Sequence, residues 1–446
     1  MKLTGKKELG ILGVLLMTAG VYSLGYQVPR TDFALLFGIY LGLFALMAFF
    51  YGLAKSTSSV RTVFIFGLIL RILLLLSFPT WSEDFARFLW DGKLLQLGFN
   101  PYLHTPNQWA QLYSEYFSAY LAELLSQMNS PDYFSVYPPL NQFFFWLIAE
   151  IGGDSLIQNL MAIRILLIGG EVGVFFLMSS LLKKFRMEKR AILLYWLNPF
   201  VILEISGNLH FEGLVLLVLL LVLFFSLKNR FYSAGAFWAV AIGLKLLPLI
   251  LAPSFWNTQS KKWAFWIGAS LVGVFLFTPL LWDQSWQNFA QSLSLYQGKF
   301  EFNASIYYLA RTVGYWVEGY NTIAVLTKGL SLLTLVLILW ISWKNNSSKV
   351  ENWVELWIGI YLIYLLLQPV IHPWYLIPGL GLSILRGKVG FLIWSFAVIF
   401  SYQAYGNENY VERPTFLVLE YSLLALALLY DYRSQYFNFL IHLWKK

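Results

Sequence analysis

The sequence predicts an all-α, polytopic transmembrane helical bundle of about 12 to 14 spans. Apolar residues make up 59% of the 446-residue chain and charged residues only 12%, whereas soluble domains carry roughly 25% charged residues. The long apolar runs, each near the ~20 residues that a membrane-spanning helix needs, are 9–26, 32–54, 61–80, 158–182, 209–228, 263–282, 322–343 and 388–405. Shorter apolar runs lie at 138–152, 190–206, 353–370, 373–385 and 414–430.

The N-terminal segment is basic and leads directly into the first apolar run. This resembles the start of a signal peptide, but no small-residue cleavage site follows it, so a first span is expected. The absence of cysteine excludes disulfides, thiolate metal sites and cysteine nucleophiles. The net charge of +8 indicates membrane orientation and no nucleic-acid binding, because basic residues mark the cytoplasmic side of membrane proteins.

Loops rich in Lys and Arg predict that both termini face the cytoplasm. These basic positions are Lys2, Lys6, Lys7, Lys55, Arg61, Lys183, Lys184, Arg186, Lys189, Arg190, Lys228, Arg230, Lys261, Lys262, Lys344, Lys349, Arg386, Lys388, Arg433, Lys445 and Lys446. The outside regions are then expected at 81–137, 207–212 and 283–321 and around His372.

Two apolar runs must deviate from simple crossing for this orientation to hold. We expect 138–152 to dip into the membrane without crossing, and Lys245 with Pro248 to divide 231–256 into two short helices. Broken helices at membrane depth are tolerated where they line a protein cavity. The whole of 1–446 is expected to be one domain, with 431–446 as a short interfacial helix.

A charged stripe opens the first outside loop. Asp84, Arg87 and Asp91 follow the apolar run 61–80 directly and, at helical spacing, project from one face. Two carboxylates and a guanidinium at a membrane surface favour chemistry on a membrane-embedded substrate. An ordinary solvated interfacial helix is the alternative explanation.

Polar residues also gather in three further regions of the sequence. The first outside loop holds Gly98-Phe99-Asn100-Pro101-Tyr102 and ends with Val136-Tyr137-Pro138-Pro139-Leu140. The second region holds Asn198-Pro199-Phe200, Glu204 and Gly207-Asn208-Leu209-His210-Phe211-Glu212-Gly213, and the third is Gln368-Pro369-Val370-Ile371-His372-Pro373-Trp374-Tyr375. Polar residues between apolar spans are costly unless they face protein or a wet cavity. Satisfied polar turns, a helix cap at His372 and a snorkelling Lys245 are the structural alternatives.

The ordered set of motifs resembles the GT-C superfamily of integral-membrane glycosyltransferases. Within it, the chain looks like the bacterial polyprenyl-phosphate-mannose-dependent mannosyltransferases and, more distantly, like the eukaryotic GPI mannosyltransferase I, whose Asp-x-Asp-like signature is Glu83-Asp84 in this chain. The resemblance implies an inverting transfer of a sugar, mannose in the nearest group, from a polyprenyl-phosphate donor to a glycan or glycolipid acceptor. It further implies an active site on the outer face of a bacterial cytoplasmic membrane.

This chemistry assigns expected roles to the polar residues. A carboxylate must take the proton of the acceptor hydroxyl, and we assign Asp84 as this base, with Glu83 and Asp91 as rivals. Arg87 is expected to orient either aspartate or to contact the phosphate, because a cation must face the leaving group. The other expected phosphate contacts are Lys245 and His372, and His210 and Glu212 are expected at sugar hydroxyls. Glu83 and Asn208 are further expected substrate-binding residues. Tyr102, Tyr137, Trp374 and Tyr375 would stack on sugars or line a lipid groove, and a purely structural role is the favoured alternative for Tyr102 and Tyr137.

Two other functions stay open at the sequence level. A transporter or flippase of lipid-linked sugars would show inverted repeats and charges near the bilayer midplane, and Arg164 with Glu171 in one apolar run supports that reading. The same enzyme fold could also use arabinose, glucose or an amino sugar. No cofactor is predicted, and the 4 histidines lack the helical pairing of a metal site.

Overall fold

The computed structural model describes residues 2–54, 57–257, 262–345, 347, 349–407 and 409–444. Within these ranges the chain is helical, and its only extended pairing is an isolated bridge between Phe302 and Val370. The predicted all-α class is therefore confirmed. Four of the basic positions used for orientation, Lys55, Lys261, Lys445 and Lys446, lie outside the described residues.

Seven described helical segments are long and apolar enough to cross a membrane, or eight if one bent pair counts as a span. They lie in α1 (Lys2–Tyr26), α2 (Phe33–Leu53), α8 (Leu156–Lys184), α14 with η5 (Lys262–Phe277 and Thr278–Leu281), α17 (Ile323–Lys344), α18 (Val350–Leu367) and α21 (Pro414–Trp444). The multi-pass class is confirmed, but the expected 12 to 14 spans exceed what these helices support.

The difference arises because much of the apolar sequence folds into short or broken helices. These are α3 (Thr57–Leu73), η2 (Lys189–Ile192), α9 (Leu193–Trp196), α10 (Pro199–Val201), η3 (Ile202–Gly207), α11 (Glu212–Leu227), α12 (Phe231–Leu244), η4 (Leu247–Leu251), α13 (Ser254–Asn257), η6 (Pro373–Leu376), α19 (Ile377–Leu385), α20 (Gly390–Ala397) and η7 (Val398–Gly406). Pro199, Pro248 and Pro373 each stand in the first turn of a new element, where the missing amide N–H is tolerated. Apolar composition alone therefore overcounts spans.

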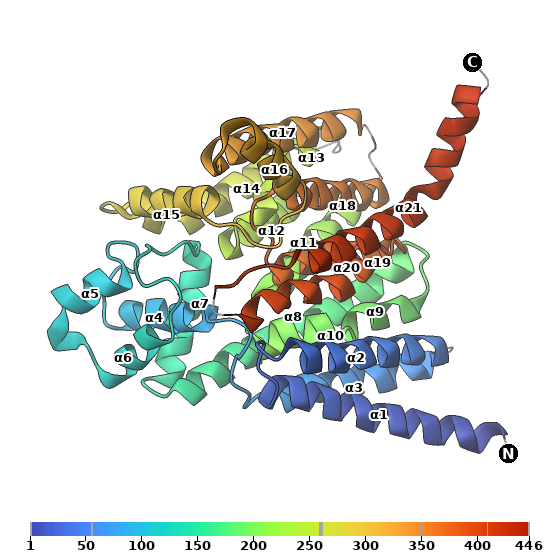
Figure 1. The fold of residues 1–446 in the computed structure, drawn as a ribbon, viewed down its shortest axis with the longest axis horizontal. Coiled ribbons are helices and arrows are strands. Elements are labelled where there is room, and N and C mark those ends of the chain that lie inside the picture. The colour runs from blue at the N-terminus through green and yellow to red at the C-terminus, as the bar shows by residue number, and fades with distance from the viewer. Residues whose placement is uncertain are drawn as a thin grey trace.

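The first expected outside loop forms a helical cap on the bundle. It contains α4 (Asp84–Gln96), α5 (Pro106–Leu112), η1 (Ser114–Tyr116) and α6 (Ala119–Ser126), followed by α7 (Pro139–Gly152). Figure 1 shows α4, α5 and α6 at one end of the molecule and both chain termini at the other. The 14 residues of α7 are too few to cross a bilayer, which agrees with the expectation that 138–152 does not cross.

The second expected outside loop, 283–321, contains α15 (Ser285–Lys299) and α16 (Ile306–Glu318). Its segment around Phe302 is joined to the turn before His372, because the Phe302 amide donates to Pro369 O at 3.0 Å and the Ile371 amide donates to Phe302 O at 2.9 Å. Two regions that are far apart in sequence are thus fixed side by side.

The two predicted helix breaks have different outcomes. The 231–256 run divides at Lys245, which is extended between α12 and η4, as predicted. The expected short helix at 431–446 is wrong, because α21 continues without interruption from Pro414 to Trp444. No Gly or Pro follows Pro414 in that helix, so nothing local stops it.

Three charged residues inside the bundle, Arg71, Arg164 and Glu171, have hydrogen-bond partners within the protein. Arg71 donates to Glu171 at 2.8 Å and to the Trp196 carbonyl at 2.9 Å, and Tyr195 donates to the second Glu171 oxygen at 2.7 Å. Arg164 instead donates to backbone carbonyls, including that of Ser206 at 2.8 Å. The suggested Arg164–Glu171 pair therefore does not form, and each group has other partners.

Candidate active site

Asp84 is the first residue of α4, where the helix dipole favours a carboxylate. Its backbone N–H donates to Ser82 Oγ at 3.3 Å. Burial raises the pKa of the Asp84 carboxyl; the positive charges of His210 and Lys245 lower it, and Glu212 and Glu83 raise it. The electrostatic neighbours of Asp84 thus come from three separate turns of the chain.

Arg87 and Asp91 form a separate buried network. Arg87 Nε donates to Asp91 Oδ1 at 2.7 Å, and another guanidinium nitrogen donates to the Tyr133 carbonyl at 2.7 Å. Asp91 is fully buried, and its Oδ2 accepts from Ser135 Oγ and from Gln142 Nε2. Of the two aspartates that Arg87 was expected to orient, it pairs with Asp91, which lies at i, i+4, and no described ion pair joins Arg87 to Asp84.

Glu83 is engaged by the connection between α1 and α2. Arg30 forms an ion pair with Glu83, donates to the Trp81 carbonyl at 2.8 Å, and lies 3.9 Å above the ring of Tyr405. This pairing distinguishes the two adjacent acids, because Asp84 has no such ion pair among the described residues. Glu83 is accordingly a weaker candidate for a base than Asp84.

The turn that carries His210 follows a π-helix, η3, a rare element often found at functional sites. The Pro199–Gly207 and Glu212–Leu227 helices meet at 112°, and Leu209 between them has a φ of 69°. Asn208 Oδ1 accepts a hydrogen bond from the backbone N–H of Trp81 at 3.2 Å. The break therefore holds the 207–212 turn against the segment just before Asp84.

Both ring nitrogens of His210 have partners inside the protein. Nδ1 lies 3.0 Å from Glu204 Oε2, and Nε2 lies 3.3 Å from Ser82 Oγ. The His210 ring stacks on Trp374, with centroids 3.7 Å apart. His210 is fully buried, so in this arrangement neither nitrogen is left for a sugar hydroxyl, contrary to the sugar-binding role expected for it.

Lys245 adds a cation beside Glu212 and Asp84. Its Nζ lies 3.2 Å from Glu212 Oε1 and 5.5 Å from the ring centroid of Tyr137. The second oxygen of Glu212, Oε2, is buried without a hydrogen-bond partner among the described residues. Burial first, and then the charge of Asp84, raises the pKa of Tyr137. Tyr137 and Lys245 therefore line the surroundings of Asp84.

The His372 turn completes the site from the C-terminal half. The His372 and Trp374 rings stack with centroids 4.5 Å apart, and Tyr375 meets His372 edge-on at 5.4 Å. Burial, followed by the charges of His210 and Lys245, lowers the pKa of His372 to about 3. His372 is thus neutral at physiological pH.

Tyr102 has a supporting position. Its hydroxyl donates to the Tyr137 carbonyl at 2.6 Å, while its own carbonyl accepts from Asn288 of α15 at 2.9 Å. The side chain is only 3% exposed and packs with Leu280 and Phe289. Tyr102 therefore joins the two outside loops and positions Tyr137, which agrees with the structural alternative for this residue.

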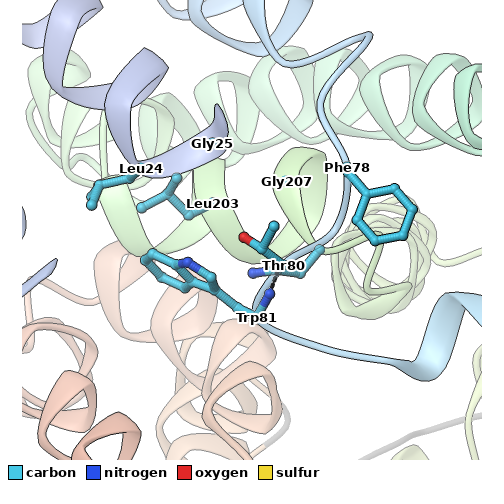
Figure 2. Close-up of a pocket in the computed structure, with 8 residues that line it drawn as sticks. Leu24, Gly25, Phe78, Thr80, Trp81, Leu203 and Gly207 are labelled. Atoms are coloured by element: carbon cyan, nitrogen blue, oxygen red, sulfur yellow. Dashed lines mark hydrogen bonds between the residues drawn. The ribbon is translucent and has the colours of Figure 1, made fainter. Parts of the chain in front are cut away.

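A small pocket lies beside this cluster. Figure 2 shows it between the end of α1, the segment from Phe78 to Trp81, and η3. Trp81 and Asn208, which both line the pocket, are joined by the hydrogen bond described above. Within the described ranges, no three His, Asp or Glu side chains are grouped to hold a metal ion.

The structure thus sorts the predicted residues into two sets. Those gathered around Asp84 are Tyr137, His210, Glu212, Lys245, His372 and Tyr375, and those with supporting contacts are Glu83, Arg87, Asp91, Tyr102 and Asn208. Sequence reasoning gave no role to Glu204, Ser82 or Tyr402. Glu204 was detectable as an acid in an apolar run, whereas nothing in the sequence separates Tyr402 from the other tyrosines.

Comparison with known proteins locates this site within a family. The chain is 26% identical over 211 residues to Alpha-(1->6)-mannopyranosyltransferase A of Corynebacterium glutamicum, which covers 46% of this chain and 38% of that protein. Residues 8–258 match the family described as Alpha-(1->6)-mannopyranosyltransferase, N-terminal domain. The match includes Asp84, Tyr137, His210, Glu212 and Lys245, and the chain therefore belongs to the alpha-(1->6)-mannopyranosyltransferase family.

Proposed function

We propose that the protein is an inverting mannosyltransferase that moves mannose from a polyprenyl-phosphate donor to a glycan or glycolipid acceptor at the outer face of the membrane. The observation that carries the proposal is the convergence of separate polar turns beside Asp84: His210 contacts Ser82, Asn208 contacts Trp81, and Lys245 pairs with Glu212. Family membership supports mannose as the sugar and an α-(1→6) linkage as the product.

Asp84 is the general base in this proposal. An acceptor hydroxyl attacks the anomeric carbon of the mannose, its proton passes to the Asp84 carboxylate, and the bond from that carbon to the phosphate oxygen breaks. A base is most effective when its pKa lies near the working pH, and burial moves the pKa of Asp84 upward in that direction. The rivals Glu83 and Asp91 are already ion-paired to Arg30 and Arg87.

Lys245 is the cation that faces the leaving phosphate. Its side chain is 17% exposed, the Glu212 side chain beside it is 4% exposed, and a preorganised cation in such a site stabilises developing negative charge without reorganisation. A single phosphate needs less neutralisation than a diphosphate, so one lysine supplies the charge that the step requires.

The two ends of the bundle support an orientation. The α4–α6 cap, whose first helix begins at Asp84, lies opposite both termini (Figure 1), and short basic loops predict that the termini are cytoplasmic. We therefore place the site at the outer leaflet of a bacterial cytoplasmic membrane, where a lipid-linked sugar would reach it from the bilayer.

A transporter or flippase is the alternative, and the 112° helix break favours it. Intramembrane charges in transporters mark substrate or ion paths. In this chain Arg71, Glu171 and Arg164 have hydrogen-bond partners within the bundle. Lys245 and Glu212 instead lie beside Asp84, which favours the enzyme.

The test uses membranes that contain the full chain, supplied with radiolabelled polyprenyl-phosphate mannose and an acceptor glycan. We expect mannose transfer by the wild type and a loss of at least about 100-fold in Asp84→Asn, with donor binding retained. Glu83→Gln and Asp91→Asn, compared per folded molecule, identify a rival base if either one alone abolishes transfer. Movement of labelled lipid across liposomes without product would support the transporter, and transfer only from another polyprenyl-phosphate sugar would reassign the donor.

A further inference from the structure

A buried chain of hydrogen bonds leads from η7 to the active-site helix. Tyr402 of η7 donates to Glu204 Oε1, Glu204 Oε2 lies 3.0 Å from His210 Nδ1, and His210 Nε2 lies 3.3 Å from Ser82 Oγ. Ser82 Oγ also accepts the backbone N–H of Asp84 at 3.3 Å. We call these four side chains, Tyr402, Glu204, His210 and Ser82, the relay.

The relay is enclosed by protein. Tyr402 is 2% exposed, Glu204 is 1% exposed, and His210 is fully buried. A buried carboxylate is costly unless its oxygens are hydrogen-bonded, and here each oxygen of Glu204 has one partner. The Glu204 side chain therefore has a fixed place, and it fixes which nitrogen of His210 faces Ser82.

The local backbone is arranged around Glu204. It lies within the π-helix η3, in which the helical turn is wider than in an α-helix. Trp374 covers the His210 ring at 3.7 Å. The ring is thus held at both nitrogens and on its face, and it has little freedom to tilt.

We propose that Glu204 and Tyr402 are positioning residues that act on Asp84 through His210 and Ser82. This inference rests on the function proposed above. The relay orients the Ser82 hydroxyl, Ser82 holds the amide at the start of α4, and the Asp84 carboxyl group keeps its direction toward the acceptor. The charges around it are Lys245 of the α12–η4 turn, Glu212 of α11 and Glu83 beside it, and His372 lies close to His210 and Lys245.

The physical reason for such a device is the sensitivity of proton transfer to geometry. Misplacing a reacting group by about 1 Å can cost about 100-fold in rate. Asp84 begins its helix, and no side-chain hydrogen bond caps the N-terminus at Glu83. The Ser82 contact to the Asp84 amide is therefore a constraint that the helix end otherwise lacks.

The test is a double-mutant cycle in the purified full-length protein, with Glu204→Gln, Ser82→Ala and the double variant assayed for mannose transfer. We expect each single change to lower kcat by about tenfold, with the KM for the donor changed by less than about twofold. The double variant should be no slower than the slower single variant, because both changes break the same relay. Losses that multiply, a change confined to KM, or wild-type kcat in both single variants would overturn the proposal.

Two further variants separate positioning from damage to the fold. Tyr402→Phe removes one hydroxyl and should also lower kcat, by a smaller factor than Glu204→Gln. It tests the relay independently if Glu204→Gln does not fold. Tyr195→Phe is the matched control, because Tyr195 also donates to a buried glutamate, Glu171, at 2.7 Å. It should leave kcat unchanged and show no coupling to Ser82→Ala. A wild type without mannose transfer overturns the proposed function itself, whereas transfer with uncoupled variants overturns only the relay.

Discussion

The ammonium nitrogen of Lys245 lies 3.2 Å from a carboxylate oxygen of Glu212. Lys245 caps the end of α12 and Glu212 begins α11, so the pair joins the two ends of an antiparallel helix hairpin beside Asp84. The lysine is held in place by a carboxylate whose second oxygen has no hydrogen-bond partner in the part of the chain that the structure describes. This arrangement presents a fixed positive charge near the proposed base.

Removing that charge should slow transfer strongly. Lys245→Met keeps the length of the aliphatic side chain but loses the ammonium group, and we expect kcat to fall by about 100-fold because the leaving phosphate loses its cation. Steady-state kinetics with a polyprenyl-phosphate mannose donor measure the change. Lys93→Met is the matched control, since Lys93 of α4 also pairs with an acid, Asp154, at 2.6 Å. Equal losses in the two variants would contradict the assignment.

The pH dependence of the reaction should report the ionisation of Asp84. A base must be deprotonated to act, so kcat/KM should fall as the pH drops through the pKa of Asp84, which burial raises above its usual value of about 3.9. In Lys245→Met the acidic limb should move to higher pH, because a cation that lowers this pKa is gone. An acidic limb unmoved by that change, or centred below about 3.9 in the wild type, would argue against Asp84 as the base.

Asp84→Asn should make the protein more resistant to unfolding while it abolishes transfer. The pKa of Asp84 is higher in the folded protein than in the unfolded chain. At pH values above the unfolded-state pKa, the ionised carboxylate therefore lowers the stability of the folded protein, and the neutral amide of asparagine removes this cost. Thermal unfolding in detergent at pH 7 should give a higher Tm for the variant, and the difference should shrink as the pH falls. A lower Tm would indicate that the carboxylate serves the fold.

Replacing Asp91 should lower the stability of the folded protein, in contrast to replacing Asp84. Asp91→Asn removes the charge that Arg87 faces, and breaking one partner of a buried ion pair costs about 3–5 kcal/mol. We expect a lower Tm and less folded protein, with the remaining folded molecules more active than Asp84→Asn. The double change Arg87→Met with Asp91→Asn should be less destabilised than Asp91→Asn alone. A stable Asp91→Asn protein without transfer would return Asp91 to the list of candidate bases.

The amino-acid sequence determined the class of this protein and the identity of its polar turns. Apolar runs define a helical membrane protein because backbone groups in a bilayer must be satisfied within helices, and dense polar residues at such depth mark places that face protein or a cavity. The segments that contain Asp84, His210, Lys245 and His372 follow from these two rules.

Only the tertiary structure decided which of these groups share a site and in what state. Helical spacing left Arg87 able to face either Asp84 or Asp91, and it pairs with Asp91 because the segment with Tyr133 and Ser135 packs over that side of α4. The link between Tyr402 and Glu204 spans 198 residues, a separation over which local patterns carry no information. The number of spans also depended on packing, because helices enclosed by protein can be shorter than the bilayer is thick.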